Sequence, residues 1–285
     1  MYYLQKAEVI LEEKEYAERF LTVFDVLKAQ DLKADICETD VVKEAENAGT
    51  AQGTILITDS VSAVRKAVKA GRAVLVFLHG KNRKQNFAGV RYAFENPEDL
   101  DREYLEQVYR RHAGLPWDIL DTERCHLRET TEADVEDFYR IYAEPSVTAY
   151  MEDLYSDPEQ EREYTRKYIE NVYGFYGFGV WTVVKKDTGE VIGRAGLSYR
   201  EGFDEPELGF VIGVPWQRKG YALEVCRAVL RYGREHLGLG TIQALVEVGN
   251  QVSLHLCKKL GMTVAGTVIV QKKQYVKLIF DELFV

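Results

Sequence analysis

The stretch Pro206-Glu-Leu-Gly-Phe-Val-Ile-Gly-Val-Pro-Trp-Gln-Arg-Lys-Gly-Tyr-Ala-Leu-Glu224 decides the fold of the second half of this chain. It begins with a mostly apolar segment, Glu207–Ile212, which predicts a strand. A short loop, Gln217–Ala222, follows, and a long helix is expected to begin directly after it. The apolar face of that helix recurs at helical spacing, as Ala222, Cys226, Val229, Leu230, Gly233 and Leu237.

The loop combines features that suit an anion. The first backbone N–H groups of a helix are unpaired and carry the positive end of its dipole. Gly220 lets a phosphate approach those groups closely, and Arg218 and Lys219 add full charges. The sequence therefore predicts a site for a phosphate or pyrophosphate, with an ordinary solvated turn as the alternative. The loop lacks the Gly-Lys-Ser/Thr ending of a P-loop, and Gly238-Leu-Gly240 leads into a strand rather than a dinucleotide-binding helix.

The elements around this stretch predict a mixed α+β domain. Three strands follow one another with short turns, which implies antiparallel pairing: Val180–Val184, Val191–Leu197 and Glu207–Ile212. The other expected elements are a strand at Arg124–Arg128, a helix capped by Thr131 with Asp134, an acidic stretch Met151–Glu163 leading into a helix that ends near Tyr173, helices Tyr221–Leu237 and Gln251–Leu260, strand Thr241–Val248 and two terminal strands.

The first third of the chain alternates helix and strand signals instead. It predicts helices at Val9–Gln30, after Ser60 and at Glu103–His112, and strands at Ala34–Cys37, Gly53–Asp59 and Ala73–Leu78. Strand, helix, strand in this order implies a parallel pair and a small Rossmann-like α/β domain. We place the boundary near residue 121, so that residues 1–121 form the α/β domain and 122–285 the α+β domain.

Composition excludes several classes of protein. The 285 residues carry a net charge of −9, which argues against a protein that coats nucleic acid or an anionic membrane. The four cysteines and five histidines are scattered, so no disulfide framework and no metal site is expected. Apolar runs are far shorter than a membrane span, and the N-terminal residues lack the pattern of a signal peptide. We expect a cytoplasmic protein.

Three motifs in order carry a resemblance to a known family. Gln217-x-x-Gly220-x-Ala222 resembles the acetyl-CoA signature of the GNAT acetyltransferase superfamily. Val246-Glu-Val-Gly-Asn250-Gln-Val-Ser253-Leu-His-Leu-Cys-Lys-Lys-Leu-Gly-Met262 resembles its later motif, and Leu127-Arg-Glu-Thr-Thr-Glu-Ala-Asp134 resembles its start. The combination is similar to the branch that includes ribosomal-protein-alanine N-acetyltransferases, and it covers about residues 122–285.

The resemblance implies how acetyl-CoA is bound. The family holds it in a splay between two central parallel strands, here Glu207–Ile212 and Thr241–Val248. Backbone groups of Phe210, Val211 and Ile212 would pair with the pantetheine arm and polarise the thioester carbonyl. Asn250 would hydrogen-bond the arm near the sulfur. The amides of Arg218, Lys219, Gly220, Tyr221 and Ala222 would hold the pyrophosphate, and Gln217 at the start of the loop belongs to the same cofactor-binding set.

The resemblance also implies that an amine attacks the thioester directly, which would need a base for the ammonium and an acid for the leaving thiolate. Glu207, at the start of the first central strand, is the first candidate base, with a structural hydrogen bond as the alternative and Glu247 as a weaker candidate. Relatives often carry a tyrosine seven residues after the Asn, where this chain has Cys257. Ser253 matches the position used as acid in the ribosomal branch, although it can also cap the helix, and water is a further source of the proton.

Acceptor recognition in this family comes mostly from the loop between the first two helices. That region is acidic here, which would attract a cationic amine, although a solvated acidic loop is the alternative. The acidic residues are Glu152, Asp153, Asp157, Glu159, Glu161 and Glu163, with Glu201, Asp204 and Glu205 before the central strand. Five aromatic residues could line the acceptor pocket, with packing in the core as the alternative: Tyr150, Tyr155, Tyr173, Phe175 and Tyr176. Exposed lysines that could meet the outer phosphate of CoA are Lys258, Lys259, Lys272 and Lys273.

Three functions compete on these observations. The first is an acetyl-CoA-dependent N-acetyltransferase, monomeric or homodimeric, acting on a small cationic amine or a protein N-terminus. The second is a non-catalytic acyl-CoA sensor whose N-terminal domain engages a partner, kept open by Cys257. The third is a phosphohydrolase, because Ile55-Leu-Ile-Thr-Asp59-Ser60 and the segment after it weakly resemble haloacid-dehalogenase-like phosphatases. That family needs an Asp-x-Asp nucleophile near its start, which the first 60 residues lack, so an accessory role is expected for this domain.

Overall fold

The computed structural model describes residues 3–37 and 52–281. The chain divides into two compact units, Met1–Trp117 and Asp118–Val285. The division falls four residues before the expected boundary, because β6 (Asp118–Asp121) pairs with β7 (Cys125–Arg128) as the last strand of the second sheet. No described helix is long and apolar enough to cross a membrane.

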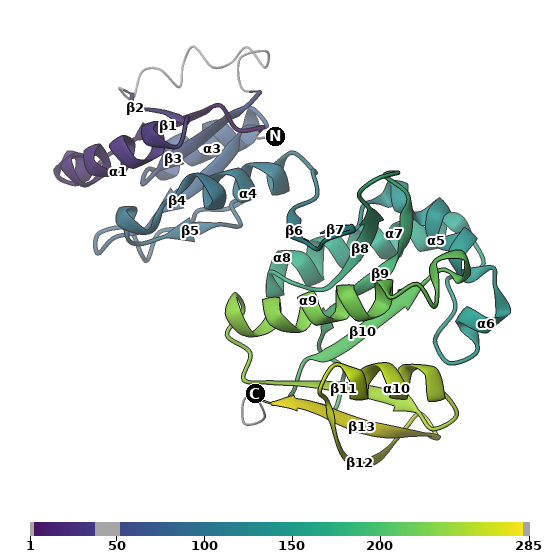
Figure 1. Ribbon diagram of the computed structural model, residues 1–285. Coiled ribbons are helices and arrows are strands. Elements are labelled where there is room, and N and C mark those ends of the chain that lie inside the picture. The colour runs from purple at the N-terminus through teal and green to yellow at the C-terminus, as the bar shows by residue number, and fades with distance from the viewer. Residues whose placement is uncertain (1–2, 38–51, 282–285) are drawn as a thin grey trace. The chain divides into compact units, whose positions relative to one another are not determined.

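The first unit is a parallel sheet with helices on both faces (Figure 1). Helices α1 and α4 cover one face, where Phe20 and Leu105 pack against strand residues, and α3 covers the other. The strands run in the order β2-β1-β3-β4-β5. The described elements are β1 (Lys6–Ile10), α1 (Ala17–Ala29), β2 (Lys33–Ile36), β3 (Thr54–Thr58), α3 (Val61–Lys69), β4 (Ala73–Phe77), β5 (Ala93–Phe94) and α4 (Arg102–His112), with 3-10 turns at Lys14–Tyr16 and Pro97–Asp99.

One expectation for this unit was wrong. Residues 9–30 do not form a single helix, because Lys6–Ile10 is a strand that pairs in parallel with both β2 and β3. The helical spacing of Phe20, Val23, Phe24 and Leu27 is real but belongs only to α1. Val9 and Ile10 fit that spacing by coincidence, and their burial comes instead from the sheet, where they are at most 1% exposed.

The second unit is a mixed sheet in the order β12-β13-β11-β10-β9-β8-β7-β6. All neighbours pair antiparallel except β10 and β11, which are parallel. The remaining strands are β8 (Val180–Lys185), β9 (Val191–Ser198), β10 (Glu207–Ile212), β11 (Thr241–Glu247), β12 (Thr263–Val270) and β13 (Lys273–Asp281). The helices are α5 (Val135–Tyr142), α6 (Pro145–Thr148), α7 (Pro158–Tyr168), α8 (Gly174–Tyr176), α9 (Tyr221–Glu235) and α10 (Gln251–Lys259), with a π-helix at Ile169–Tyr173 joining α7 to α8.

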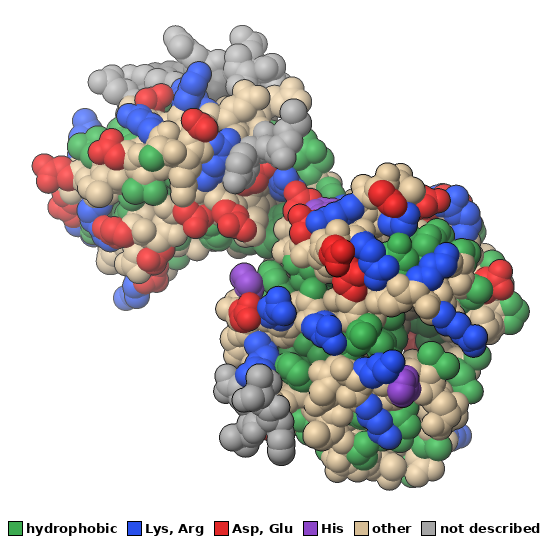
Figure 2. All heavy atoms as spheres, in the orientation of Figure 1, with side chains coloured by type: hydrophobic (Ala, Val, Ile, Leu, Met, Phe, Trp, Pro, Cys, Tyr) green, Lys and Arg blue, Asp and Glu red, His purple; other side chains and the backbone are tan. Residues whose placement is uncertain are grey.

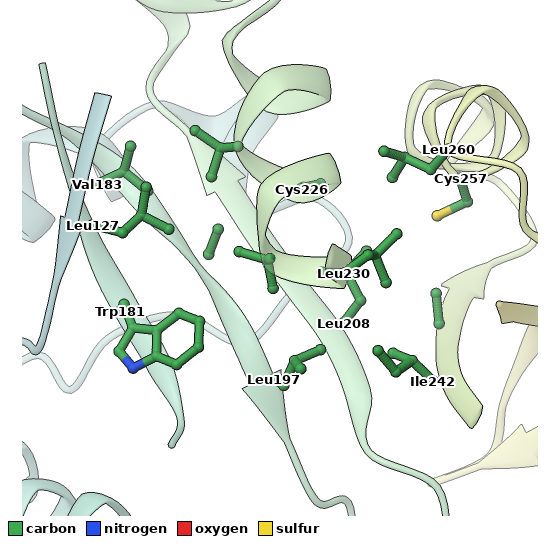
Figure 3. Packing of buried hydrophobic residues seen from close by; sticks show 14 of the residues in the cluster. Leu127, Trp181, Val183, Leu197, Leu208, Cys226, Leu230, Ile242, Cys257 and Leu260 are labelled. Atoms are coloured by element: carbon green, nitrogen blue, oxygen red, sulfur yellow. The ribbon is translucent and has the colours of Figure 1, made fainter. Parts of the chain in front are cut away.

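An apolar cluster lies on each face of this sheet, and the members of each cluster show which strand side chains face α9 and which face α5. On one face of the sheet, Leu208 of β10 packs with Cys226 and Leu230 of α9 (Figure 3). Ile212 of the same strand belongs to this cluster. On the other face, Val211 packs with Phe138 and Tyr142 of α5. Because side chains alternate along a strand, Glu207 shares the α5 face with Val211. The helix expected after Asp134 starts with the predicted capping box between Thr131 and Asp134.

Candidate functional site

The two parallel strands β10 and β11 meet at one register position only. Glu207 lies opposite Gln243, and the Gln243 N–H donates to the Pro206 carbonyl at 2.9 Å. Beyond this point β10 runs on to Ile212 and β11 to Glu247 without pairing with each other. The backbone groups on the facing edges of the two strands are therefore available to a third, extended partner.

The alternation of backbone groups decides which residues face this gap. Gly213 N–H donates to the Ile192 carbonyl of β9 at 2.9 Å, so Val211, two residues earlier, also turns its backbone to β9. The Val211 carbonyl lies against Gly193 of that strand. Phe210 and Ile212 therefore face the gap and Val211 does not, which corrects the expected set of three. The Ile212 carbonyl already accepts a hydrogen bond from Gln217 Nε2 at 2.8 Å, which leaves the N–H of Ile212 and the backbone of Phe210 for a ligand.

The loop after β10 opens onto the start of α9. Arg218 and Gly220 both have positive φ, at +58° and +87°, which bends the chain sharply before the helix. No side chain of the described residues caps the first turn of α9, so its first N–H groups remain open. A Cβ on Gly220 would meet only one atom within 4 Å, Nη2 of Arg124 at 3.4 Å. Backbone donors at an uncapped helix start are the donor set that a pyrophosphate fits.

Arg124 is a residue of this site that the sequence did not single out for chemistry. Its guanidinium donates to the Lys219 carbonyl at 3.0 Å and stacks over the Tyr221 ring, 4.2 Å from the centroid. The Arg124 Nε donates to the carboxylate of Glu224 on α9 at 2.7 Å. Arg124 adds a positioned positive charge to those of Arg218 and Lys219, both exposed. Figure 2 shows a face of this unit on which lysine and arginine side chains outnumber acidic ones, although the whole chain is acidic.

We predict that Arg124→Ala weakens acetyl-CoA binding about tenfold or more, because a charge-assisted contact to phosphate is lost. Calorimetric titration of acetyl-CoA measures the change. Lys186→Ala is the matched control. Lys186 is another cation near β7, and its ammonium donates to the Thr122 carbonyl at 2.7 Å. An equal loss of affinity in both variants would contradict a specific role for Arg124.

Asn250 and Ser253 lie at the start of α10, after β11. Asn250 Oδ1 accepts the Ser253 N–H at 3.1 Å and caps the helix. The Asn250 amide nitrogen and the Ser253 hydroxyl make no hydrogen bond with the described residues, so both remain open to a ligand. The structure also brings Tyr150 here: a Cβ on Gly249 would lie 3.1 Å from its ring.

The candidate base Glu207 is paired. Arg200 Nε and Nη2 donate to its two carboxylate oxygens at 2.5 and 3.1 Å, and the residue is 8% exposed. The alternative candidate, Glu247, accepts from Lys273 Nζ at 3.0 Å. Cys257 is fully buried in the apolar cluster under α9, and burial raises the pKa of its thiol to about 11. The thiol therefore does not reach a ligand in the gap.

Part of the acidic region is neutralised, whereas the exposed Glu152, Asp153, Glu201 and Asp204 form no ion pair with described residues. Glu159 pairs with Arg162, Glu163 with Lys167 and Glu205 with Lys277. Asp157 caps α7. Glu161 is 3% exposed and accepts the Tyr155 N–H at 3.1 Å. This pairing weakens the case for attraction of a cationic acceptor.

The aromatic candidates include both buried and exposed side chains, and the basic candidates are exposed. Tyr173 is core, 1% exposed, and donates its hydroxyl to the Val180 carbonyl, whereas Tyr155, Phe175 and Tyr176 are exposed. Lys258, Lys259 and Lys272 are exposed on α10 and in the turn after β12. Within residues 3–37 and 52–281, no group of histidine, cysteine or acidic side chains is arranged to hold a metal ion.

In the first unit, Asp59 follows β3 at the edge where parallel sheets usually bind ligands. Its two oxygens accept the backbone N–H groups of Glu12 and Glu13 at 2.6 and 3.0 Å, and it is 2% exposed. His79 Nε2 lies 3.4 Å from the same carboxylate. The carboxylate therefore anchors the segment after β1, which favours a structural role over that of a nucleophile.

Comparison with known proteins bears on the second unit. The model of an acetyltransferase (GNAT) domain matches residues 124–263. Two proteins of Bacillus subtilis (strain 168) are similar: the uncharacterized protein YkkB, 30% identical over 152 residues, and the uncharacterized N-acetyltransferase YoaA, 30% identical over 155 residues. Each match covers 52% of this chain, and 87% and 84% of the relatives. The ribosomal-protein-S5-alanine acetyltransferase of Vibrio fischeri shares the fold, with a TM-score of 0.50 and 14% identity over 58% of this chain and 98% of that one.

Proposed function

The chain belongs to the GNAT acetyltransferase family through its second unit, and on this premise we propose that it transfers an acetyl group from acetyl-CoA to a primary amine. The observation that carries the proposal is the gap between β10 and β11, which leads to the uncapped start of α9. An extended arm with a pyrophosphate at one end matches both parts. The acceptor is a small amine or the amino terminus of a peptide.

Each part of the chain has a distinct task in this proposal. The loop amides and Arg124 hold the pyrophosphate, and the Asn250 amide donates to the pantetheine arm. The Phe210 N–H faces the gap and polarises the thioester carbonyl. The thioester supplies an activated acyl group, so the amine can attack without a covalent enzyme intermediate.

Proton transfer is assigned to two groups. Glu207 lies on the α5 face and takes the proton of the ammonium, which requires its pair with Arg200 to open. Ser253, or a water beside it, returns a proton to the leaving thiolate, since its hydroxyl is open and Cys257 is buried. General acid and base groups each contribute about a hundredfold or more to the rate.

Glu207→Gln is expected to lower kcat about a hundredfold and to remove the fall of kcat on the acid side of its pH profile. The amide keeps the shape of the carboxylate but cannot take a proton. Steady-state rates over a range of pH measure both effects, with Glu205→Gln as control because that carboxylate pairs with Lys277 beside the strand. An unchanged pH profile would show that Glu207 only anchors Arg200.

The function itself is tested by release of CoA thiol from acetyl-CoA with a pool of amines. The proposal predicts amine-dependent release, matched by an N-acetylated amine in the mass spectrum. Binding of acetyl-CoA with no release for any amine would overturn the proposal in favour of an acyl-CoA sensor. The buried Cys257 is the observation that favours this second function.

A further inference from the structure

Arg194 lies in the middle of β9, on the face of the sheet that α5 covers. Its register neighbours are Thr182 on β8 and Val211 on β10. The guanidinium carbon lies 4.6 Å from the centre of the Phe138 ring. A cation is therefore held between the sheet and α5, one strand away from the gap.

No described residue neutralises this cation. Within the described chain Arg194 makes no ion pair. Its guanidinium has a hydrogen bond with the neutral phenol of Tyr142, whereas its Nε is cut off from solvent and has no hydrogen-bond partner among the described residues. Burial alone would lower the pKa of Arg194, but the phenols of Tyr142, Tyr173 and Tyr168 around it raise the pKa, so the side chain stays charged. A buried charge without a counter-charge is costly, and proteins normally pair it with an opposite charge and satisfy each of its donors.

Three carboxylates of this face are engaged by other groups. Asp134 reaches the neighbouring strand through Thr182 but is held by both terminal nitrogens of Arg128. Glu161 is turned to the Tyr155 amide, and Glu207 to Arg200. Glu152 and Asp153 act electrostatically on Tyr164 and Tyr142 but are exposed, and no ion pair joins them to Arg194 in the described chain. Arg194 therefore differs from the other arginines of this face in lacking an acidic partner.

Arg194 lies close to the gap in which the thioester is expected. Val211 and Arg194 lie opposite each other on neighbouring strands, so their Cα atoms are about 5 Å apart. Phe210, next in the chain, presents the N–H that faces the gap. An amine at the thioester would thus have Arg194 within reach of a second group on the same molecule.

We propose that Arg194 binds a carboxylate of the acceptor, so that the preferred substrate is an amine that also carries a carboxylate, such as a free amino acid. The proposal rests on the proposed acetyl transfer. A guanidinium offers a planar pair of N–H donors that matches a carboxylate, and the apolar ring of Phe138 beneath it strengthens the contact by excluding water.

Matched substrates test the proposal with the full chain and acetyl-CoA. β-Alanine and lysine are compared with β-alaninamide and lysinamide, and peptides with acidic and neutral amino termini form a third arm. The native chain is expected to prefer each acid over its amide at least tenfold in kcat/KM. The amine of the amide is less basic, which by itself favours the amide, so the preference cannot come from amine basicity.

Arg194→Met is expected to bring the acid-to-amide ratio close to one without changing the KM for acetyl-CoA, and Arg194→Lys to keep part of the preference. Arg231→Met is the control, since Arg231 is exposed on α9, on the opposite face. Equal use of acids and amides by the native chain, or a preference that survives in Arg194→Met, overturns the proposal. If only peptides with acidic amino termini are preferred over their neutral counterparts, the substrates are peptide termini, and the assignment to free amino acids is overturned.

Binding alone separates this proposal from the proposed function. With CoA present, N-acetyl-β-alanine should raise the thermal midpoint of the native chain and of Arg194→Lys more than N-acetyl-β-alaninamide does. This comparison needs no turnover, and Arg194→Lys serves if the Met variant does not fold. Equal shifts of the thermal midpoint with the two compounds would overturn the carboxylate site, even if the chain acetylates amines. A larger shift with N-acetyl-β-alanine, in a chain that releases no CoA thiol with any amine, would overturn only the proposed acetyl transfer.

Discussion

Gly220→Glu is expected to reduce the affinity for acetyl-CoA about a hundredfold or more. The new side chain would start 3.4 Å from Arg124 Nη2 and place a carboxylate over the open start of α9, where the pyrophosphate is expected to lie. Like charges a few ångströms apart near a protein surface repel by several kcal/mol, and about 2.7 kcal/mol already corresponds to a hundredfold. Calorimetric titration measures the loss.

Gly238→Glu is the matched control for this prediction. Gly238 follows the other end of α9, has a φ of +65° and has nothing within 4 Å of its Cβ position. The two variants share the strain of a left-handed backbone and the added charge, but they differ in distance from the proposed site. Equal affinities for acetyl-CoA in the two variants would place the ligand elsewhere.

Asp134→Ala is expected to destabilise the second unit by about 3–5 kcal/mol, because it leaves the partly buried Arg128 without its partner. Asp134 is 3% exposed and holds Arg128 at 2.6 and 2.7 Å, together with the Thr131 N–H and the Thr182 hydroxyl. Urea unfolding followed by tryptophan fluorescence reports mainly on this unit, which contains Trp181 and Trp216, and Trp117→Phe removes the signal of the one tryptophan in the first unit.

The control is Asp137→Ala on α5, the helix that begins directly after Asp134; the partner of Asp137, Arg140, is 78% exposed. Exposed pairs contribute at most about 1 kcal/mol. If both variants lose the same small stability, the Asp134 network does not support the fold as described.

The contribution of Asp134 also has a defined pH dependence. Burial alone would raise the pKa of Asp134, but the hydrogen bonds and charge of Arg128, with those of Thr131 and Thr182, outweigh it and lower the pKa. The folded state therefore binds this proton less tightly than the unfolded state, where the value is about 3.9. The stability difference between the native chain and Asp134→Asn should be full above about pH 5 and shrink as the pH falls below about 4.

Local patterns were sufficient for the parts of the fold that lie close together in sequence. The strand, loop and helix of residues 207–235 were predicted because apolar spacing, the glycine and the cations all lie in one stretch. Strand β1 was missed because its burial depends on pairing with β3, whose first residue, Thr54, lies opposite Lys6. Val9 and Ile10 satisfied a helical pattern that only tertiary pairing could reject.

The site shows the same limit. The contact of Arg124 with Lys219 joins residues 95 positions apart, so no local signal reveals it. The Arg200–Glu207 pair spans only seven positions, and an arginine just before a strand that starts with glutamate was a usable signal. Arg194 was visible as the one charge within the strand Val191–Ser198, although only the structure shows that no acidic side chain of the described residues pairs with it.

The account rests on acetyl-CoA lying between β10 and β11 of the second unit. Hydrogen–deuterium exchange of the full chain with and without acetyl-CoA tests this most directly, because backbone N–H groups are the proposed ligands. We predict slower exchange at residues 210–222 and 247–253 and no change in residues 52–117. Unchanged exchange throughout at saturating acetyl-CoA, or protection confined to the first unit, would contradict the account.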